Sequence, residues 1–172
     1  MKPRLSVVVA LAAAAALAGC DKPKPRHPGP AAAAAPRINT TTTAVPAPPA
    51  WLADVLGKKL ADAFPQPGAC KGVTDGVDMH YQGGSPGTRI AGWAWDTLNK
   101  TPVPRVVLVD KDLQIVGGGE SGALRPDVVA GQTDVTSPMT GWTAVTTLTT
   151  GSLDTYGLVG GQATCRLGHV DF

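Results

Sequence analysis

Ser85 has the most recognisable catalytic surroundings in this 172-residue chain. Residues 83–87 match the G-x-S-x-G pattern of serine hydrolases, and His169 follows late in the chain, as a Ser-His pair would require. In that pattern the residue after the serine donates its backbone N–H to the oxyanion, and Pro86 has no N–H. Residues 88–95 are also typical of a strand, whereas the motif leads into a helix. We therefore expect no serine hydrolase.

Two other patterns suggest ligands and are rejected on their context. Residues 117–122 match G-x-G-x-x-G, which in dinucleotide-binding proteins opens a helix. Pro126 would interrupt such a helix, so we expect a loop at residues 117–122. Residues 110–114 lack the glycine and the distal glutamate of a calcium loop. We expect no enzyme activity, no cofactor and no metal site.

Trp93 and Trp95 are the side chains best suited to bind a sugar ring. In a strand, residues two apart share a face, so both indoles point the same way. Facing outward they would form a stacking platform; facing inward they would form the centre of the core, which we favour because the domain has few other large side chains. Arg125 and Asp127 are further candidate ligand-binding residues, although Arg125 is expected mainly to hold its loop by pairing with Asp96 or Asp127.

The amino terminus predicts export. Lys2 and Arg4 precede an apolar run over residues 5–18, which is shorter than the roughly 20 residues of a membrane-spanning helix. The run leads into Leu-Ala-Gly-Cys20, which resembles the lipobox of bacterial lipoproteins. The resemblance implies that residues 1–19 are cleaved as a signal peptide and that Cys20 is acylated, which would anchor the mature chain in a membrane. The alternative is an ordinary cleaved signal that happens to end beside a cysteine.

The residues after the cysteine predict a location and a spacer. By the same resemblance, Asp21 favours the periplasmic face of the inner membrane, with the outer membrane as the alternative. Residues 20–50 are rich in Pro, Ala and Thr and bury too little apolar surface to fold alone, so we predict a disordered tether. Its basic side chains would lie against anionic lipid or stay solvated.

The charge distribution argues against a nucleic-acid partner. The whole chain carries a formal charge of +2, but residues 51–172 contain nine basic and twelve acidic side chains. A domain that binds DNA or RNA needs clustered Lys and Arg to displace counterions from phosphates. The expected partners are instead the membrane, through Cys20, and an envelope glycan or envelope protein.

Cys70 and Cys165 are the two cysteines that remain if Cys20 is acylated. In a chain exported to an oxidising compartment they should form a disulfide between the start of the domain and its last strand. A zinc site is not expected, because only His80 and His169 could assist and their spacing is not that of a metal site.

Apolar residues at helical spacing predict one short amphipathic helix in residues 51–64, which Pro65 ends. The stripe consists of Trp51, Leu52, Val55, Leu56, Leu60 and Phe64. We expect this helix, with a lead-in that extends to residue 69, to pack on the domain that follows. The alternative is that it lies in the membrane interface.

The folded domain is predicted for residues 70–172. Seven short runs there are rich in Val, Thr, Trp and Tyr and are separated by Gly, Pro, Asp and Asn. The runs are residues 77–81, 88–96, 103–110, 113–116, 141–149, 156–159 and 163–167. Because no helical period occurs between them, the sequence predicts an all-β fold, an antiparallel Ig-like β-sandwich of about seven strands.

Three motifs in this domain also resemble a known module. Gly-Trp-Ala-Trp-Asp at residues 92–96, the run at 104–110 and Arg-Pro-Asp-Val at 125–128 are similar to a β-sandwich domain in extracytoplasmic parts of bacterial envelope proteins. Some of those proteins are associated with the assembly of cell-surface polysaccharide. The resemblance covers about residues 70–167 and implies a fold, but no catalytic residues.

These features together predict a membrane-anchored envelope lipoprotein with a non-catalytic binding module. Its ligand would be a cell-envelope glycan or the machinery that assembles one, bound by the loops around residues 83–88 and 117–127. The alternative is a structural or accessory lipoprotein that contacts other proteins through a sheet edge.

Overall fold

The computed structural model describes residues 38–172, which form strands and three short helices. The strands are β1 (Asn39–Thr41), β2 (Gln66–Pro67), β3 (Cys70–Tyr81), β4 (Gly87–Asp96), β5 (Thr101–Pro102), β6 (Arg105–Val109), β7 (Ile115–Ala123), β8 (Gly141–Thr146), β9 (Ser152–Val159) and β10 (Ala163–Asp171). The helices are the 3-10 helix η1 (Ala50–Asp54) and the α-helices α1 (Leu60–Ala63) and α2 (Pro126–Gly131). The predicted signal peptide, Cys20 and Asp21 lie outside the described residues.

The strands form one open sheet in the order β1-β3-β4-β8-β7-β6-β9-β10-β2, with β5 beside β4 and off this path. The β1–β3 and β10–β2 pairs are parallel and the others are antiparallel, so the sheet is mixed. The predicted all-β class is confirmed, and every predicted run overlaps one of the seven longer strands. An antiparallel Ig-like sandwich is not confirmed, because the strands follow a single hydrogen-bonded path that ends in parallel pairs.

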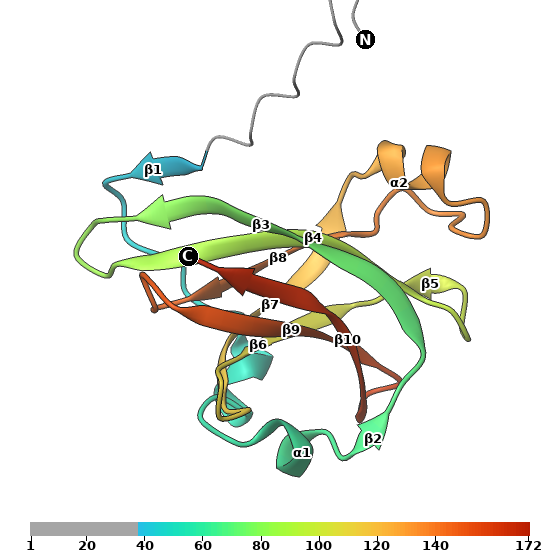
Figure 1. Cartoon of the computed structure of the whole chain (residues 1–172), viewed down its shortest axis with the longest axis horizontal. Coiled ribbons are helices and arrows are strands. Elements are labelled where there is room, and N and C mark those ends of the chain that lie inside the picture. The colour runs from blue at the N-terminus through green and yellow to red at the C-terminus, as the bar shows by residue number, and fades with distance from the viewer. Residues whose placement is uncertain (1–37) are drawn as a thin grey trace, which may run out of the picture. The chain divides into compact units, whose positions relative to one another are not determined.

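The two ends of the sheet approach each other. β3 and β10 are far apart in the strand order, yet they lie against each other in space. Figure 1 shows β3, in green, beside the red strands β9 and β10. A disulfide joins Cys70 on β3 to Cys165 on β10, with Cα atoms 5.9 Å apart, which confirms the predicted pairing. The curved sheet is thus linked covalently where its strands are not paired by backbone hydrogen bonds.

The main core is enclosed by this curved sheet and draws on β4, β6, β8, β9 and β10. Its buried members are Ile90, Ala94, Val103, Val106, Leu108, Trp142, Ala144, Leu153, Val159, Cys165, Leu167 and Val170. Trp142 packs against β4 at Gly92, where a Cβ atom would collide with the indole ring. Close packing of a large ring on a glycine therefore fixes how β8 lies beside β4.

The prediction of one amphipathic helix over residues 51–64 is wrong, whereas the prediction that this segment packs on the domain is correct. Gly57 adopts a left-handed conformation with φ of 81° and separates η1 from α1. Its N–H donates to the carbonyl of Ile115, and Leu60 donates to Leu113, so these backbone donors bond to β7 and the turn before it rather than along a helix. Leu52 and Leu60 are buried in a second cluster against β6, β7 and β9. The segment packs on the domain, as predicted.

The predicted tether is also corrected at its C-terminal end. Asn39–Thr41 forms β1 and pairs with the last residues of β3, and the Val45 N–H donates to the Ser85 carbonyl at 2.7 Å. Threonine favours strands, and the prolines that follow have no backbone N–H that must be paired. The chain can therefore lie on the outside of the sheet. The folded part therefore begins by residue 39, ahead of residue 51.

Candidate functional site

Trp93 and Trp95 share one face of β4, as the strand period predicts, but they do not form an open platform. Their exposed fractions are 8% and 1%, and they form a small cluster with Val128 and Val135 from the segment between β7 and β8. The cluster is separate from the main core, which Ala94 joins from the opposite face of the strand. Sequence reasoning correctly favoured burial but placed the two indoles in the central core.

Arg125 fastens the same segment to the sheet. Its Nε and Nη2 donate to the two carboxylate oxygens of Asp127 at 2.9 and 2.8 Å, and its Nη1 donates to Asp75 on β3 at 2.5 Å. The hydrogen bonds to Arg125 lower the pKa of Asp127, against a smaller effect of burial. The predicted pairing with Asp127 is confirmed, whereas Asp96 instead accepts hydrogen bonds from the N–H groups of Leu98 and Asn99. Arg125 and Asp127 therefore serve the chain's own packing.

The residues 117–122, predicted as a loop, belong to strand β7. Three successive glycines let neighbouring groups come close on both faces, with Leu52 of η1 packed at Gly118. The strand continues to Ala123 before α2 begins at Pro126. The loop predicted for residues 117–122 is therefore wrong, because these residues form a strand. The G-x-S-x-G run at residues 83–87 does lead into a strand, β4, as expected.

Sequence reasoning missed a cluster on the outer surface of β9 and β10. Ser152 Oγ lies 2.8 Å from His169 Nε2, and His169 Nδ1 lies 2.8 Å from Asp154 Oδ1. These distances are those of a Ser-His-Asp triad. Asp171 Oδ1 lies 3.2 Å from the same Nε2, and Arg166 donates to Asp154 at 2.7 Å.

The surroundings of this cluster do not support acyl transfer. The backbone N–H groups of Gly151 and Phe172, next to the cluster in the chain, bond to each other's carbonyls at 2.7 and 2.9 Å and are therefore not available to an oxyanion. The His169 side chain is 46% exposed, and a carboxylate shares the nitrogen that would activate the serine. The cluster is therefore a surface hydrogen-bond network. Alternating Ser, Asp and His could be seen in the sequence, but their meeting depends on strand register.

A groove between residues 51–64 and strands β6 and β9 is the best candidate for a ligand site. We call it the aromatic groove, and it has a volume of about 340 Å³. Its lining residues are Trp51, Asp54, Val55, Phe64, Pro104, Arg105, Leu158 and Gly161. Two aromatic rings beside one carboxylate and one guanidinium combine stacking surfaces with hydrogen-bonding groups. Sequence reasoning assigned Trp51 and Phe64 to a helix stripe and therefore did not propose this site.

Arg105 is the charged group with the most defined position in the aromatic groove. Its guanidinium carbon lies 5.0 Å from the centroid of the Trp51 ring, within the range of a cation–π contact. The other three arginines in residues 38–172 pair with carboxylates: Arg89 with Asp78, Arg125 with Asp75 and Asp127, and Arg166 with Asp154.

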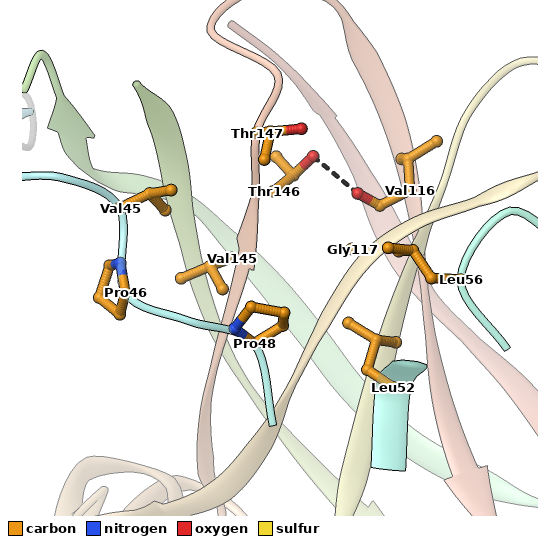
Figure 2. A pocket seen from close by; sticks show the side chains of 10 residues that line it. All are labelled: Val45, Pro46, Pro48, Leu52, Leu56, Val116, Gly117, Val145, Thr146 and Thr147. Carbon is orange, nitrogen blue, oxygen red and sulfur yellow. Dashed lines mark hydrogen bonds between the residues drawn. The ribbon is translucent and has the colours of Figure 1, made fainter. Parts of the chain in front are cut away.

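A second hollow lies where the proline-rich segment crosses the sheet (Figure 2). Figure 2 shows Pro46 and Pro48 opposite Leu52 and Leu56, with the Thr146 hydroxyl bonded to the Val116 carbonyl at 2.9 Å. Its volume is about 70 Å³, and its lining is mostly apolar. Of its two threonine hydroxyls, that of Thr146 is already bonded within the chain, so this hollow offers few groups to orient a polar ligand.

No family model, curated protein or solved structure matches this chain. Among residues 38–172, no helix is long and apolar enough to cross a membrane. Within the same range, no group of three or more His, Cys, Asp or Glu side chains is placed to hold a metal ion. The assignment of function therefore depends on the N-terminal sequence and on the groove.

Proposed function

We propose that this chain is a membrane-anchored envelope lipoprotein whose β domain is a non-catalytic binding module for a cell-envelope glycan or a protein that assembles one. The Leu-Ala-Gly-Cys20 sequence supports the anchor, and Asp21 supports the periplasmic face of the inner membrane, with the outer membrane as the alternative. The Cys70–Cys165 disulfide is consistent with an exported protein.

The aromatic groove is the observation that carries the binding role. Trp51 and Phe64 are both partly exposed there, whereas Trp93, Trp95 and Trp142 are buried. Aromatic rings bind the C–H faces of sugars, and Asp54 and Arg105 offer an acceptor and donors for ring hydroxyls. Neither the loop at residues 83–88 nor strand β7 offers a comparable set of groups.

The alternative, protein contacts through a sheet edge, has less support. The strands at the two ends of the sheet are short, with three residues in β1 and two in β2. The long edges next to them belong to β3 and β10, which lie against each other across the disulfide. Little unpaired edge is left for strand addition.

The proposal is tested with the full-length protein and a panel of envelope polysaccharides and peptidoglycan fragments. Trp51 is the one partly exposed tryptophan of the four, so it dominates quenching by acrylamide. A glycan that occupies the groove should protect Trp51 from the quencher. Asp54→Asn should weaken binding by about tenfold, since hydrogen bonds to charged groups are worth more than neutral ones.

Trp51→Phe identifies the reporter. The variant should lose most of the acrylamide quenching, and with it the protection that a bound glycan gives, while calorimetry still detects glycan binding. Asp62→Asn is a matched control, because Asp62 lies in α1 and does not line the groove. Absence of binding to every glycan in the panel, by both fluorescence and calorimetry, would overturn the glycan-binding role.

A further inference from the structure

We infer that the aromatic groove takes an acidic glycan and that Arg105 binds the carboxylate or phosphate of one of its sugar units. The inference rests on the proposed function and specifies the class of ligand. It depends on the pairing state of Arg105, on its orientation over Trp51, and on the groups beside it in the groove.

The pairing state distinguishes Arg105 from every other described arginine. Arg89, Arg125 and Arg166 each form an ion pair with a carboxylate, but Arg105 forms none within residues 38–172. Glu120 lies opposite Arg105 in the register of β6 and β7, yet the two side chains are not in ion-pair contact. The Arg105 side chain therefore keeps its hydrogen-bond donors for a ligand.

The orientation of Arg105 suits an oxyanion. Its guanidinium lies over the Trp51 ring at 5.0 Å, which restrains the side chain before a ligand arrives. A guanidinium held on an aromatic face still presents N–H groups at its edge, and these match the two oxygens of a carboxylate or phosphate. Restraint before binding lowers the entropy cost of immobilising a long side chain.

The rest of the groove distinguishes a glycan from a free anion. Phe64, Val55 and Leu158 provide apolar surface for a sugar ring, and Asp54 can accept a bond from a hydroxyl. An isolated phosphate ion would use Arg105 alone and would be repelled by Asp54. A sugar unit that carries its charge on one side can satisfy both groups at once.

The test compares three probes with the full-length protein by calorimetry. Galacturonic acid oligosaccharides carry carboxylates, their fully methylated esters are neutral and of equal length, and oligomannosides bearing mannose 6-phosphate carry phosphate. At least one acidic probe should bind at least tenfold more tightly than the neutral ester. The probe that binds more tightly identifies the source of the negative charge, and inorganic phosphate alone should bind at least tenfold more weakly than that probe.

Two variants with equal charge change sharpen this test. Arg105→Gln should weaken binding of the acidic probe by about tenfold or more and should weaken binding of the neutral ester much less, because only the acidic probe loses a charged partner. Arg166→Gln removes an arginine that is paired with Asp154 outside the groove, and it should change neither. A melting temperature close to that of the wild type would show that each variant is folded.

The outcomes separate this inference from the proposed function. Equal binding of acid and ester, an unchanged preference in Arg105→Gln, or no binding by any of the three probes would overturn the acidic-glycan inference. Binding of a neutral envelope polysaccharide in the groove would leave the proposed function standing in each of these cases. Failure of the whole glycan panel would overturn the acidic-glycan inference together with the glycan-binding form of the proposed function.

Discussion

At the scale of single residues, His169 makes the stability of the protein depend on pH. Protonated His169 donates to Asp154 and Asp171, and the hydrogen bond to Asp154 is the main cause that raises the pKa of His169 above its ordinary value of 6.5. The resulting stabilisation is complete below the unfolded pKa and is lost as pH rises through the higher folded pKa. We expect the free energy of unfolding to fall as pH rises from the ordinary histidine value of 6.5 through the higher pKa of the folded state.

Urea unfolding at a series of pH values measures this effect. His169→Gln keeps a polar side chain but cannot titrate, so its stability should change less across the same window. Because His169 is exposed, the effect should be small and should shrink in high salt. A flat profile for the wild type, or an equal fall in the variant, would contradict the role of His169.

The cluster around His169 could not be predicted from the sequence, because it depends on how β9 and β10 pair. The pairs Asp154–His169 and Ser152–Asp171 face each other because residues 152–155 of β9 and residues 168–171 of β10 pair in one register. A slip by one residue would turn His169 to the other face of the sheet and disperse the cluster. The sequence contains these four residues at alternating positions of two segments, but register depends on the whole sheet.

At the scale of elements, Gly92 allows β4 and β8 to pack. A Cβ atom at this position would meet the Trp142 indole and the carbonyl of Val73. Gly92→Ala should therefore lower the free energy of unfolding by about 1–3 kcal/mol through overpacking. Gly84→Ala is the matched control, because no atom lies within 4 Å of a Cβ there. Chemical denaturation of both variants measures the difference, and equal stabilities would contradict the prediction.

The segment around α2 depends on Arg125 to cover Trp93 and Trp95. Arg125→Gln breaks the contacts with Asp127 and Asp75, so we expect a loss of about 1 kcal/mol and faster acrylamide quenching of the two indoles. A Trp51→Phe background isolates the buried tryptophans. Lys111→Gln, which removes an exposed pair in the β6–β7 turn, should leave the quenching unchanged. Unchanged quenching in Arg125→Gln would mean that the apolar contacts hold the segment alone.

The elements differ in how far the sequence predicts them. The seven longer strands follow from local runs of Val, Thr and aromatic residues, because each run is sufficient to favour an extended chain. The prediction of one helix over residues 51–64 was wrong. The apolar period correctly predicts burial of Leu52 and Leu60, but it does not predict that Gly57 donates to Ile115 instead of continuing a helix. Strand β1 was missed because a three-residue strand is stable only against a partner already in place.

At the scale of the whole molecule, the aromatic groove exists only after distant parts of the chain meet. Trp51 and Phe64 come from the segment between β1 and β2, Arg105 begins β6, and Gly161 lies in the turn between β9 and β10. No local pattern joins these positions, which explains why sequence reasoning chose Trp93 and Trp95 instead. Those two have the spacing of a platform, but the segment between β7 and β8 covers them.

The same scale governs the Cys70–Cys165 disulfide, which closes 95 residues of chain and joins the two ends of the curved sheet. Without it, β3 and β10 would be held mainly by side-chain contacts, and the unfolded chain would gain conformational freedom.

The double variant Cys70→Ser and Cys165→Ser should lose about 4–5 kcal/mol of unfolding free energy by the chain-entropy estimate. Thermal and urea unfolding measure the loss, and replacing both cysteines avoids a free thiol. A reductant should shift the wild type toward the variant and leave the variant unchanged; a loss below about 1 kcal/mol would mean that packing alone closes the sheet.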